Sequence, residues 1–225
     1  MGATGQRGGA TAGASRAKPA RAKPARAPSG AARPARTPSR DVEAALIDAA
    51  ERVLVRDGPE AVTVRAVAVE AGVAPMGVYN RFGGKDGLVD ELLKRGFTGL
   101  RDALLPRGEI DAGERLFGAG LRYRDFALGN RAHYLAMFDD AIHQDVTAPE
   151  VMLIARASFD ELVGHVTYGM GMGALAGGDP DEVAQQIWST VHGAVQLEIK
   201  GMLLVPDAEQ NYRELLGMLL RGLRP

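Results

Sequence analysis

The sequence predicts an all-α protein, with a three-helix N-terminal unit that contains a helix-turn-helix and a larger helical region after it. Three observations lead to this class. From Asp41 onward, apolar residues recur at the three- and four-residue spacing of a helix. No alternation of apolar and polar residues is long enough to indicate a strand. Two of the short helical segments are joined by a tight turn that contains glycine.

Composition excludes several functional classes. Apolar residues make up 46% of the 225 residues and charged residues 24%, which is ordinary for a globular protein with a sizeable core. The chain has no cysteine, which excludes disulfides, thiolate nucleophiles, thiolate zinc sites and iron–sulfur clusters and favours a reducing, cytoplasmic location. No run of about 18 apolar residues exists, so we expect no membrane-spanning segment.

Charge is distributed unevenly along the chain. Residues 1–40 hold nine Lys or Arg and no Asp or Glu, whereas the rest of the chain carries a net charge of −10. These 40 residues are mostly Gly, Ala, Pro, Ser, Thr, Arg and Lys, so we expect a disordered basic tail. Three roles are open for it: a solubilising extension, a targeting peptide, or a polycationic arm that follows DNA phosphates. The segment that follows favours the arm.

The first two helices are predicted within residues 41–88. The first ends at Asp57-Gly58-Pro59. Its apolar stripe consists of Leu46, Ala49, Ala50, Val53 and Leu54. Thr63 is placed as the N-cap of the second helix, because its hydroxyl can accept from an exposed amide of the first turn. Gly72 is expected to end this helix in the left-handed conformation.

A short third helix and a long fourth helix follow. Pro75 suits the first turn of the third helix, which is expected to end near Arg81. Gly83-Gly84 break the chain, and a long connecting helix is predicted over about 85–104. Two short helices with a tight turn between them form a helix-turn-helix, whose second helix enters the major groove of DNA.

The segment from Thr63 to Leu88, TVRAVAVEAGVAPMGVYNRFGGKDGL, resembles the tetracycline-repressor (TetR) family of bacterial regulators. The resemblance covers about 60 residues and is carried by the spacing of Gly72, Tyr79, Phe82 and Lys85. It implies a helix-turn-helix DNA-binding domain over 41–88 and a C-terminal regulatory and dimerisation domain over 105–225.

The same resemblance implies a set of DNA contacts. Thr63, Tyr79 and Lys85 would contact phosphates. Asn80 is able to make a bidentate bond to adenine, whereas its apolar neighbours could only touch thymine methyl groups. The full implied set is Thr63, Arg65, Ala74, Pro75, Met76, Gly77, Tyr79, Asn80, Arg81 and Lys85. Two alternatives stay open: Tyr79 as a packing aromatic, and Arg81 as the partner of an acidic neighbour. The family more often has small polar residues at Pro75-Met76 and Pro-Ser or Pro-Asn at Gly83-Gly84.

The charge of residues 41–104, which we call the reading unit, links this segment to the tail. Residues 41–104 carry eight basic and eleven acidic residues, a net of −3, so this segment lacks long-range attraction to DNA. The basic tail lies directly before it. We therefore expect the tail to add affinity and the helix-turn-helix to add selection.

Five more helices are predicted after Pro106, near 111–128, 130–140, 149–172, 180–204 and 208–223. Asp179 and Pro180 form the start signal of the fourth of these. The last two helices are apolar over more than one narrow stripe, so about 180–223 is expected to form a homodimer interface. Two-fold symmetry would then place two recognition helices about one DNA turn apart, on a pseudo-palindromic operator.

The stretch Trp188-Ser-Thr-Val-His192-Gly193 resembles a signature of one subgroup of TetR regulatory domains. One interpretation is a packed core with a satisfied histidine, in which Gly193 permits a close helix approach. The other is the wall of a cavity for a small-molecule effector. The candidate ligand-binding residues are Tyr123, Phe126, Tyr134, Met137, Phe159, Trp188 and His192.

The sequence gives little indication of a metal site, a cofactor site or a catalytic site. Asp139, Asp140, His143 and Asp145 crowd together but look like a polar loop, so no metal and no cofactor is expected. No phosphate-binding loop or nucleophile motif is present, so an enzyme is not expected. We therefore expect a sequence-specific DNA-binding regulator, a repressor released by a small apolar ligand and acting on the nucleoid in the cytoplasm. The alternative is a nucleoid-architectural protein that binds DNA through its tail.

Overall fold

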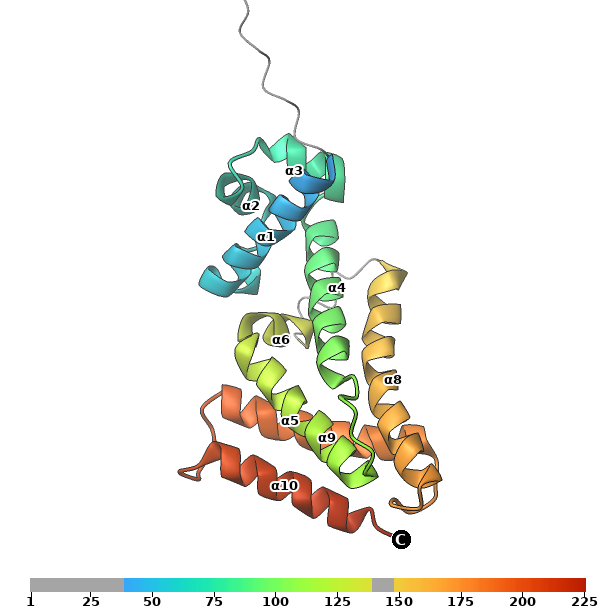
Figure 1. Cartoon of the computed structure of the whole chain (residues 1–225). Coiled ribbons are helices and arrows are strands. Elements are labelled where there is room, and N and C mark those ends of the chain that lie inside the picture. Colours follow the sequence, from blue (N-terminus) through green and yellow to red (C-terminus); the bar gives the residue numbers. More distant parts are fainter. Residues whose placement is uncertain (1–38, 139–147) are drawn as a thin grey trace, which may run out of the picture. The chain divides into compact units, whose positions relative to one another are not determined.

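The computed structural model describes residues 39–138 and 148–225, and these residues form helices without any strand, as the sequence predicts (Figure 1). The N-terminal elements are α1 (Ser39–Asp57), the 3₁₀ turn η1 (Pro59–Ala61), α2 (Val64–Glu70) and α3 (Pro75–Phe82). The long α4 (Lys85–Leu104) follows. The remaining helices are α5 (Ala112–Gly129), α6 (Arg131–Met137), α8 (Pro149–Gly171), α9 (Pro180–Ile199) and α10 (Ala208–Gly222). The basic tail falls almost wholly outside the described residues.

Local signals decide where the helices begin. The Ala66 amide donates to Thr63 Oγ1 at 3.2 Å, so Thr63 is the N-cap of α2, as predicted. Asp179 caps α9 by accepting from the Asp181 amide at 2.9 Å, and Pro180 occupies the first turn. A side-chain oxygen at these positions satisfies an amide that has no partner within the helix.

Glycines end several helices. Gly72 and Gly83 adopt φ values of +66° and +72°, the left-handed conformation that closes α2 and α3. The predicted helix 180–204 is wrong at its C-terminal end, because Gly201 takes φ +66° and α9 ends at Ile199. Met202, which falls inside the predicted range, lies beyond the helix and is exposed.

The buried side chains form two hydrophobic clusters, and α4 belongs to both. We call the first the reading core; it joins α1, α2 and α3 to Leu88 and Leu92 of α4. We call the second the body core; it joins α5, α8, α9 and α10 to the adjacent face of α4. The α4 residues in the body core are Val89, Leu93, Phe97, Leu100 and Leu104. Figure 1 shows α4 leading away from α3 and running alongside α8.

None of the described helices is both long and apolar enough to cross a membrane.

Candidate functional site

The helix-turn-helix exposes most of the residues that the sequence assigns to DNA. Val78 is fully buried and fixes α3 on the reading core, which turns the opposite side of the helix outward. Met76 and Tyr79 remain 64% and 51% exposed, which a core or packing role does not explain. The predicted contact residues that are exposed are Thr63, Arg65, Ala74, Pro75, Met76, Tyr79, Asn80 and Lys85.

Two predicted contact residues are less accessible. Gly77 and Arg81 are half-buried. The Arg81 guanidinium donates from Nη1 to the Gly77 carbonyl at 3.1 Å, one turn back along α3. No ion pair between Arg81 and an acidic residue is recorded in the described part of the chain, so the acidic-neighbour alternative finds no support there.

Acidic residues pair with several cations of α1 and α4. Arg52 and Arg56 of α1 both bind Glu70 at the end of α2, each at 2.8 Å. Hydrogen bonds from these two arginines hold the pKa of Glu70 below its usual range, so the carboxylate stays charged. Lys94 and Arg95 are also paired with carboxylates. Within the described residues, Arg65 has no recorded ion pair, which leaves it available to a phosphate.

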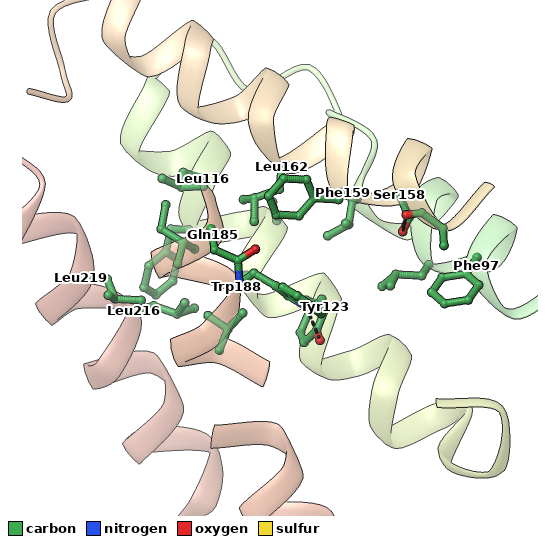
Figure 2. Close-up of a pocket in the computed structure, with 18 of the residues that line it drawn as sticks. Phe97, Leu116, Tyr123, Ser158, Phe159, Leu162, Gln185, Trp188, Leu216 and Leu219 are labelled. Carbon is green, nitrogen blue, oxygen red and sulfur yellow. Dashed lines mark hydrogen bonds between the residues drawn. The ribbon is translucent and has the colours of Figure 1, made fainter. Parts of the chain in front are cut away.

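A cavity of about 410 Å³ lies within the body core. Its wall is almost entirely apolar and comes from α4, α5, α8, α9 and α10, with Met137 and Phe138 at the end of α6. Arg156 and Gln185 are exposed, so they mark the side on which the cavity reaches the surface. Figure 2 shows the lining side chains converging on this space.

The structure brings four of the seven predicted ligand residues to the cavity wall. They are Tyr123, Met137, Phe159 and Trp188. Phe126 does not line the cavity; its ring lies against Gly99 of α4, within 3.1 Å of the position a Cβ would take. Tyr134 and His192 are also absent from the wall, because they lie behind Tyr123.

Tyr123, Tyr134 and His192 form a compact polar group, which we call the tyrosine–histidine cluster. The two hydroxyl oxygens are 2.9 Å apart. They lie 3.0 and 2.8 Å from His192 Nδ1. The indole of Trp188 donates to the Tyr123 hydroxyl at 3.3 Å (Figure 2). Phe138 covers the cluster, with its ring centroid 4.6 Å from that of His192.

Burial keeps this cluster neutral. It raises the pKa of Tyr123 to about 12 and raises the pKa of Tyr134 as well, because a phenolate would lose its hydration. It lowers the pKa of His192 below the ordinary histidine value, and the nearby charge of Lys200 acts in the same direction. All three side chains are therefore uncharged near neutral pH.

Sequence reasoning missed much of the wall. The largest omission is aliphatic: leucines of α4, α5, α8 and α10, together with Phe97, Phe117 and Phe138. Phe97 lies on the same α4 stripe as Leu93 and Leu100, so helical spacing could have identified it as buried. Spacing alone does not separate residues that fill a core from residues that surround a void.

Two further predictions from the sequence concern Gly193 and the acidic group near residue 140. Within the described residues of one chain, a Cβ at Gly193 would meet no atom within 4 Å, so no close helix approach occurs there, and an approach to a second subunit stays a prediction. The group Asp139, Asp140, His143 and Asp145 lies outside the described residues.

Comparison with known proteins identifies the family. Residues 46–92 match the family model of the bacterial regulatory proteins of the tetR family, and residues 116–219 match the tetracyclin repressor-like C-terminal domain. The chain is 30% identical over 146 residues to the HTH-type transcriptional regulator BetI of Rhizobium meliloti, covering 61% of this chain and 68% of that protein. This chain belongs to the TetR family.

Solved structures agree with this assignment of the TetR-family chain. A Rhodococcus sp. RHA1 protein of unknown function is 28% identical, with a TM-score of 0.75 over 82% of this chain and 96% of that one. FadR of Bacillus subtilis, solved with stearoyl-CoA, is 20% identical, with a TM-score of 0.64 over 81% and 100%. The chain is thus a helix-turn-helix transcriptional regulator, and its family is one of regulators rather than enzymes. The comparisons give no support to the nucleoid-architectural alternative.

Proposed function

We propose that this TetR-family regulator is a repressor that binds a pseudo-palindromic operator as a homodimer and is released by a small, largely apolar ligand. It acts in the cytoplasm, on the nucleoid. The main observation behind the proposal is that α4 contributes side chains to both hydrophobic cores. This helix begins three residues after the recognition helix α3 and contributes one stripe to the reading core and another to the cavity wall.

DNA is read by the exposed side of α3 and by the starts of α2 and α4. Asn80 supplies the bidentate contact to an adenine, and Met76 touches a thymine methyl group. Thr63, Arg65, Tyr79 and Lys85 hold phosphates, which fixes the register of α3 in the groove. The exposure of these side chains supports this assignment. Gly77 lets the backbone approach the bases, and Arg81 supports α3 through its bond to the Gly77 carbonyl.

The homodimer forms through α9 and α10. Met218 and Leu197 are 61% and 45% exposed on these helices, and Met218 lines a groove that is formed by α10 together with Thr190 of α9. Exposed apolar side chains gathered on two adjacent helices are typical of a protein–protein interface. An antiparallel pairing of both helices with their copies gives a four-helix interface with two-fold symmetry.

Two helices couple the cavity to the reading unit. Besides α4, the short α6 places Ala136 in the reading core and the neighbouring Met137 in the cavity wall. Arg95 of α4 binds Asp48 and Glu51 of α1, and His133 of α6 lies 3.4 Å from Glu51. A ligand that favours one arrangement of α4 and α6 therefore shifts α1 and α3. Coupling of this kind is typically about 1–3 kcal/mol and acts equally in both directions.

The ligand occupies the cavity and contacts Tyr123, Met137, Phe159 and Trp188, with the aliphatic side chains around them. Tyr134, Phe126 and His192, which the sequence also nominates, act one layer behind by holding Tyr123 and α4 in place. The volume of about 410 Å³ is within the usual range for small-molecule sites. FadR, which shares the fold, was solved with a ligand that carries a long acyl chain.

The first experiment is a selection of genomic fragments by the purified protein, followed by footprinting. A short palindromic footprint that a truncated protein starting at Asp41 still produces supports the repressor. Broad binding that disappears with the first 40 residues contradicts it. Comparing the salt dependence of affinity for both proteins tests the tail: if its nine cations neutralise phosphates, truncation flattens the slope. Equal slopes would exclude that role.

A further inference from the structure

We propose that the cavity selects an uncharged, mainly hydrocarbon ligand with one hydrogen-bond acceptor, such as a ketone or ester carbonyl, which accepts the hydrogen of the Tyr123 hydroxyl. The inference rests on the proposed function, because it names the chemical class of the effector. It follows from two features: which polar groups of the wall can still form a hydrogen bond, and how charge is balanced where the cavity opens.

The described wall contains few polar groups, and most are already bonded. Ser158 donates its hydroxyl hydrogen to the Ala155 carbonyl at 2.7 Å, within its own helix. The indole N–H of Trp188 is donated to Tyr123. Gln185 is exposed, and its amide is bonded to Ser189. Among the described wall residues, Tyr123, whose side chain is only 4% exposed, therefore carries the buried hydroxyl that still has a hydrogen to donate to a ligand.

Hydrogen counting within the tyrosine–histidine cluster shows that Tyr123 can donate. The two hydroxyl oxygens and His192 Nδ1 each lie within hydrogen-bonding distance of the other two, and each hydroxyl has one hydrogen. With the imidazole proton on Nε2, Tyr134 donates to Nδ1, and Tyr123 can turn its hydrogen to a ligand at the loss of one internal bond. With the proton on Nδ1, His192 donates to Tyr134 and Tyr134 to Tyr123. The Tyr123 hydrogen then has no acceptor within the cluster.

Both arrangements offer a hydrogen to a ligand acceptor, and the arrangement with the proton on Nδ1 also leaves no lone pair of the Tyr123 oxygen for a ligand donor. The Tyr123 oxygen already accepts from Trp188 in both cases. A ligand carbonyl uses the one hydrogen that can be redirected. A ligand hydroxyl or amine hydrogen would need a lone pair of the Tyr123 oxygen, and with the imidazole proton on Nδ1 both lone pairs are already used by Tyr134 and Trp188. Burial makes an unmatched polar group costly, so the polar group of the ligand has to be placed at Tyr123 or outside the cavity.

Charge argues against an anionic ligand at both ends of the cavity. The tyrosine–histidine cluster is neutral, so it offers no cation to a carboxylate. Arg156, at the open side, is held by Asp160 at 2.7 Å and by Asp181 at 2.6 Å. Two carboxylates therefore surround one guanidinium, and a further anion beside it would be repelled.

The cavity volume limits the size of the ligand. At the packing density of protein interiors, about 0.75, a cavity of 410 Å³ holds a molecule of about 300 Å³. A ketone with a medium-length carbon chain satisfies both this volume and the single acceptor.

The test uses full-length protein and three probes of matched chain length: dodecan-2-one, dodecane and dodecanoate. Trp188 is the only tryptophan in the sequence and lies in the cavity wall, so its fluorescence reports binding directly. We expect dodecan-2-one to bind more tightly than either other probe and to release operator DNA. Tyr123→Phe should weaken ketone binding about tenfold while dodecane binding is unchanged, because only the hydroxyl is removed.

Tyr168→Phe is the matched control. It removes a tyrosine hydroxyl that donates to the Ile110 carbonyl at 2.8 Å, away from the cavity, and should leave affinity for every probe unchanged. The double variant Asp160→Asn, Asp181→Asn tests the charge argument, since it leaves Arg156 unneutralised and should raise dodecanoate affinity at least tenfold.

The outcomes separate this inference from the proposed function. If dodecanoate binds wild-type protein more tightly than the ketone and releases operator DNA, the ligand class is overturned while the ligand-released repressor stands. If Tyr123→Phe lowers the affinity for dodecan-2-one and for dodecane equally, the proposed ligand class is also overturned. If no probe changes Trp188 fluorescence or operator binding, the ligand class is overturned, and the palindromic footprint decides separately whether the protein is an operator-binding repressor.

Discussion

The two hydrophobic cores of this regulator are built from different side chains. The buried residues that make up the reading core are all Ala, Val or Leu. The body core adds Phe97, Tyr123, Tyr134 and Met137, and more aromatic side chains pack at its margin. The body core also encloses the cavity of about 410 Å³. The reading core is thus built from small aliphatic side chains, and the body core also contains large rings.

This difference indicates a division of labour. Small aliphatic side chains allow the short helices α2 and α3 to pack closely, so the recognition helix has one fixed position. Large rings in the body leave apolar space, and an empty apolar space costs stability that an occupant can restore. The reading core is therefore suited to a fixed geometry, and the body core to a change of state. The boundary between them, at α4 and α6, is where the two properties meet.

The largest effect should come from the surface that joins two copies of the body. Met218→Glu places a charge on the exposed apolar face of α10. If that face forms the dimer, the variant becomes monomeric in light scattering, and operator affinity falls 10²- to 10⁴-fold because two linked half-sites become one. Met152→Glu is the matched control, since Met152 is 58% exposed on α8, away from α9 and α10. A wild-type mass that stays monomeric at every concentration would refute the dimer.

The next effect tests the close packing of the reading unit. A Cβ at Gly87 would lie 2.0 Å from the Phe82 carbonyl oxygen, a backbone atom that cannot rotate away. Gly87→Ala should therefore lower the free energy of unfolding by about 3 kcal/mol or more and abolish operator binding. Chemical denaturation followed by circular dichroism measures the first effect, and gel-shift titration the second.

Gly164→Ala provides the contrast in the body. Gly164 lies within α8, and a Cβ there would meet no atom within 4 Å. Alanine should stabilise the helix by about 0.5–1 kcal/mol. Equal losses from both substitutions would show that the two regions tolerate added volume alike, against the comparison above.

A third experiment fills the cavity. Ala119 and Ala127 are both buried in α5, but only Ala119 lines the cavity. Ala119→Leu places new methyl groups in empty space, so we expect a gain of about 1 kcal/mol in unfolding free energy and loss of ligand-induced operator release. Ala127→Leu overpacks the core and should cost about 1–3 kcal/mol. An equal loss for Ala119→Leu would mean that the cavity is closed in solution.

The reading unit could be predicted from the sequence almost to the residue. Its signals are local: Thr63 caps α2, Pro75 starts α3, and Gly72 and Gly83 adopt the left-handed conformation that their positions require. The predicted end of α9 was wrong because residues 202–205 continue the apolar pattern past Gly201. The glycine marks the end of the helix, although the apolar residues after it favour a longer one.

The cavity could be predicted only in part. Its aromatic residues were identifiable as large side chains on several helices, but which of them face empty space depends on how five helices pack together. His192 illustrates the limit: its place four residues after Trp188 suggested a shared wall, yet it lies behind Tyr123 and acts through a hydrogen bond. The ion pairs that neutralise Arg52 and Arg56 were equally invisible, because Glu70 is distant in sequence.

The smallest effect concerns acid, which should loosen the body before the reading unit. All four histidines lie after residue 104, and the three within the described residues, at 133, 165 and 192, have pKa values lowered by burial. Each binds a proton less readily folded than unfolded, so stability is fully present above the ordinary value of 6.5 and falls as pH decreases below it. The slope is at most about 1.4 kcal/mol per pH unit for each histidine.

His165 makes this prediction specific. Its Nδ1 accepts from Arg115 at 3.0 Å and its Nε2 donates to the Leu104 carbonyl at 2.8 Å, so the neutral ring joins α8 to α5 and to the end of α4. A proton on Nδ1 would break the first bond and place a charge beside Arg115. His165→Gln retains one acceptor and one donor without titrating, so unfolding measured between pH 7.5 and 5.5 should show a shallower decline than wild type. An unchanged decline would assign the acid sensitivity to the other two described histidines, His133 at the α1 boundary and His192 in the tyrosine–histidine cluster.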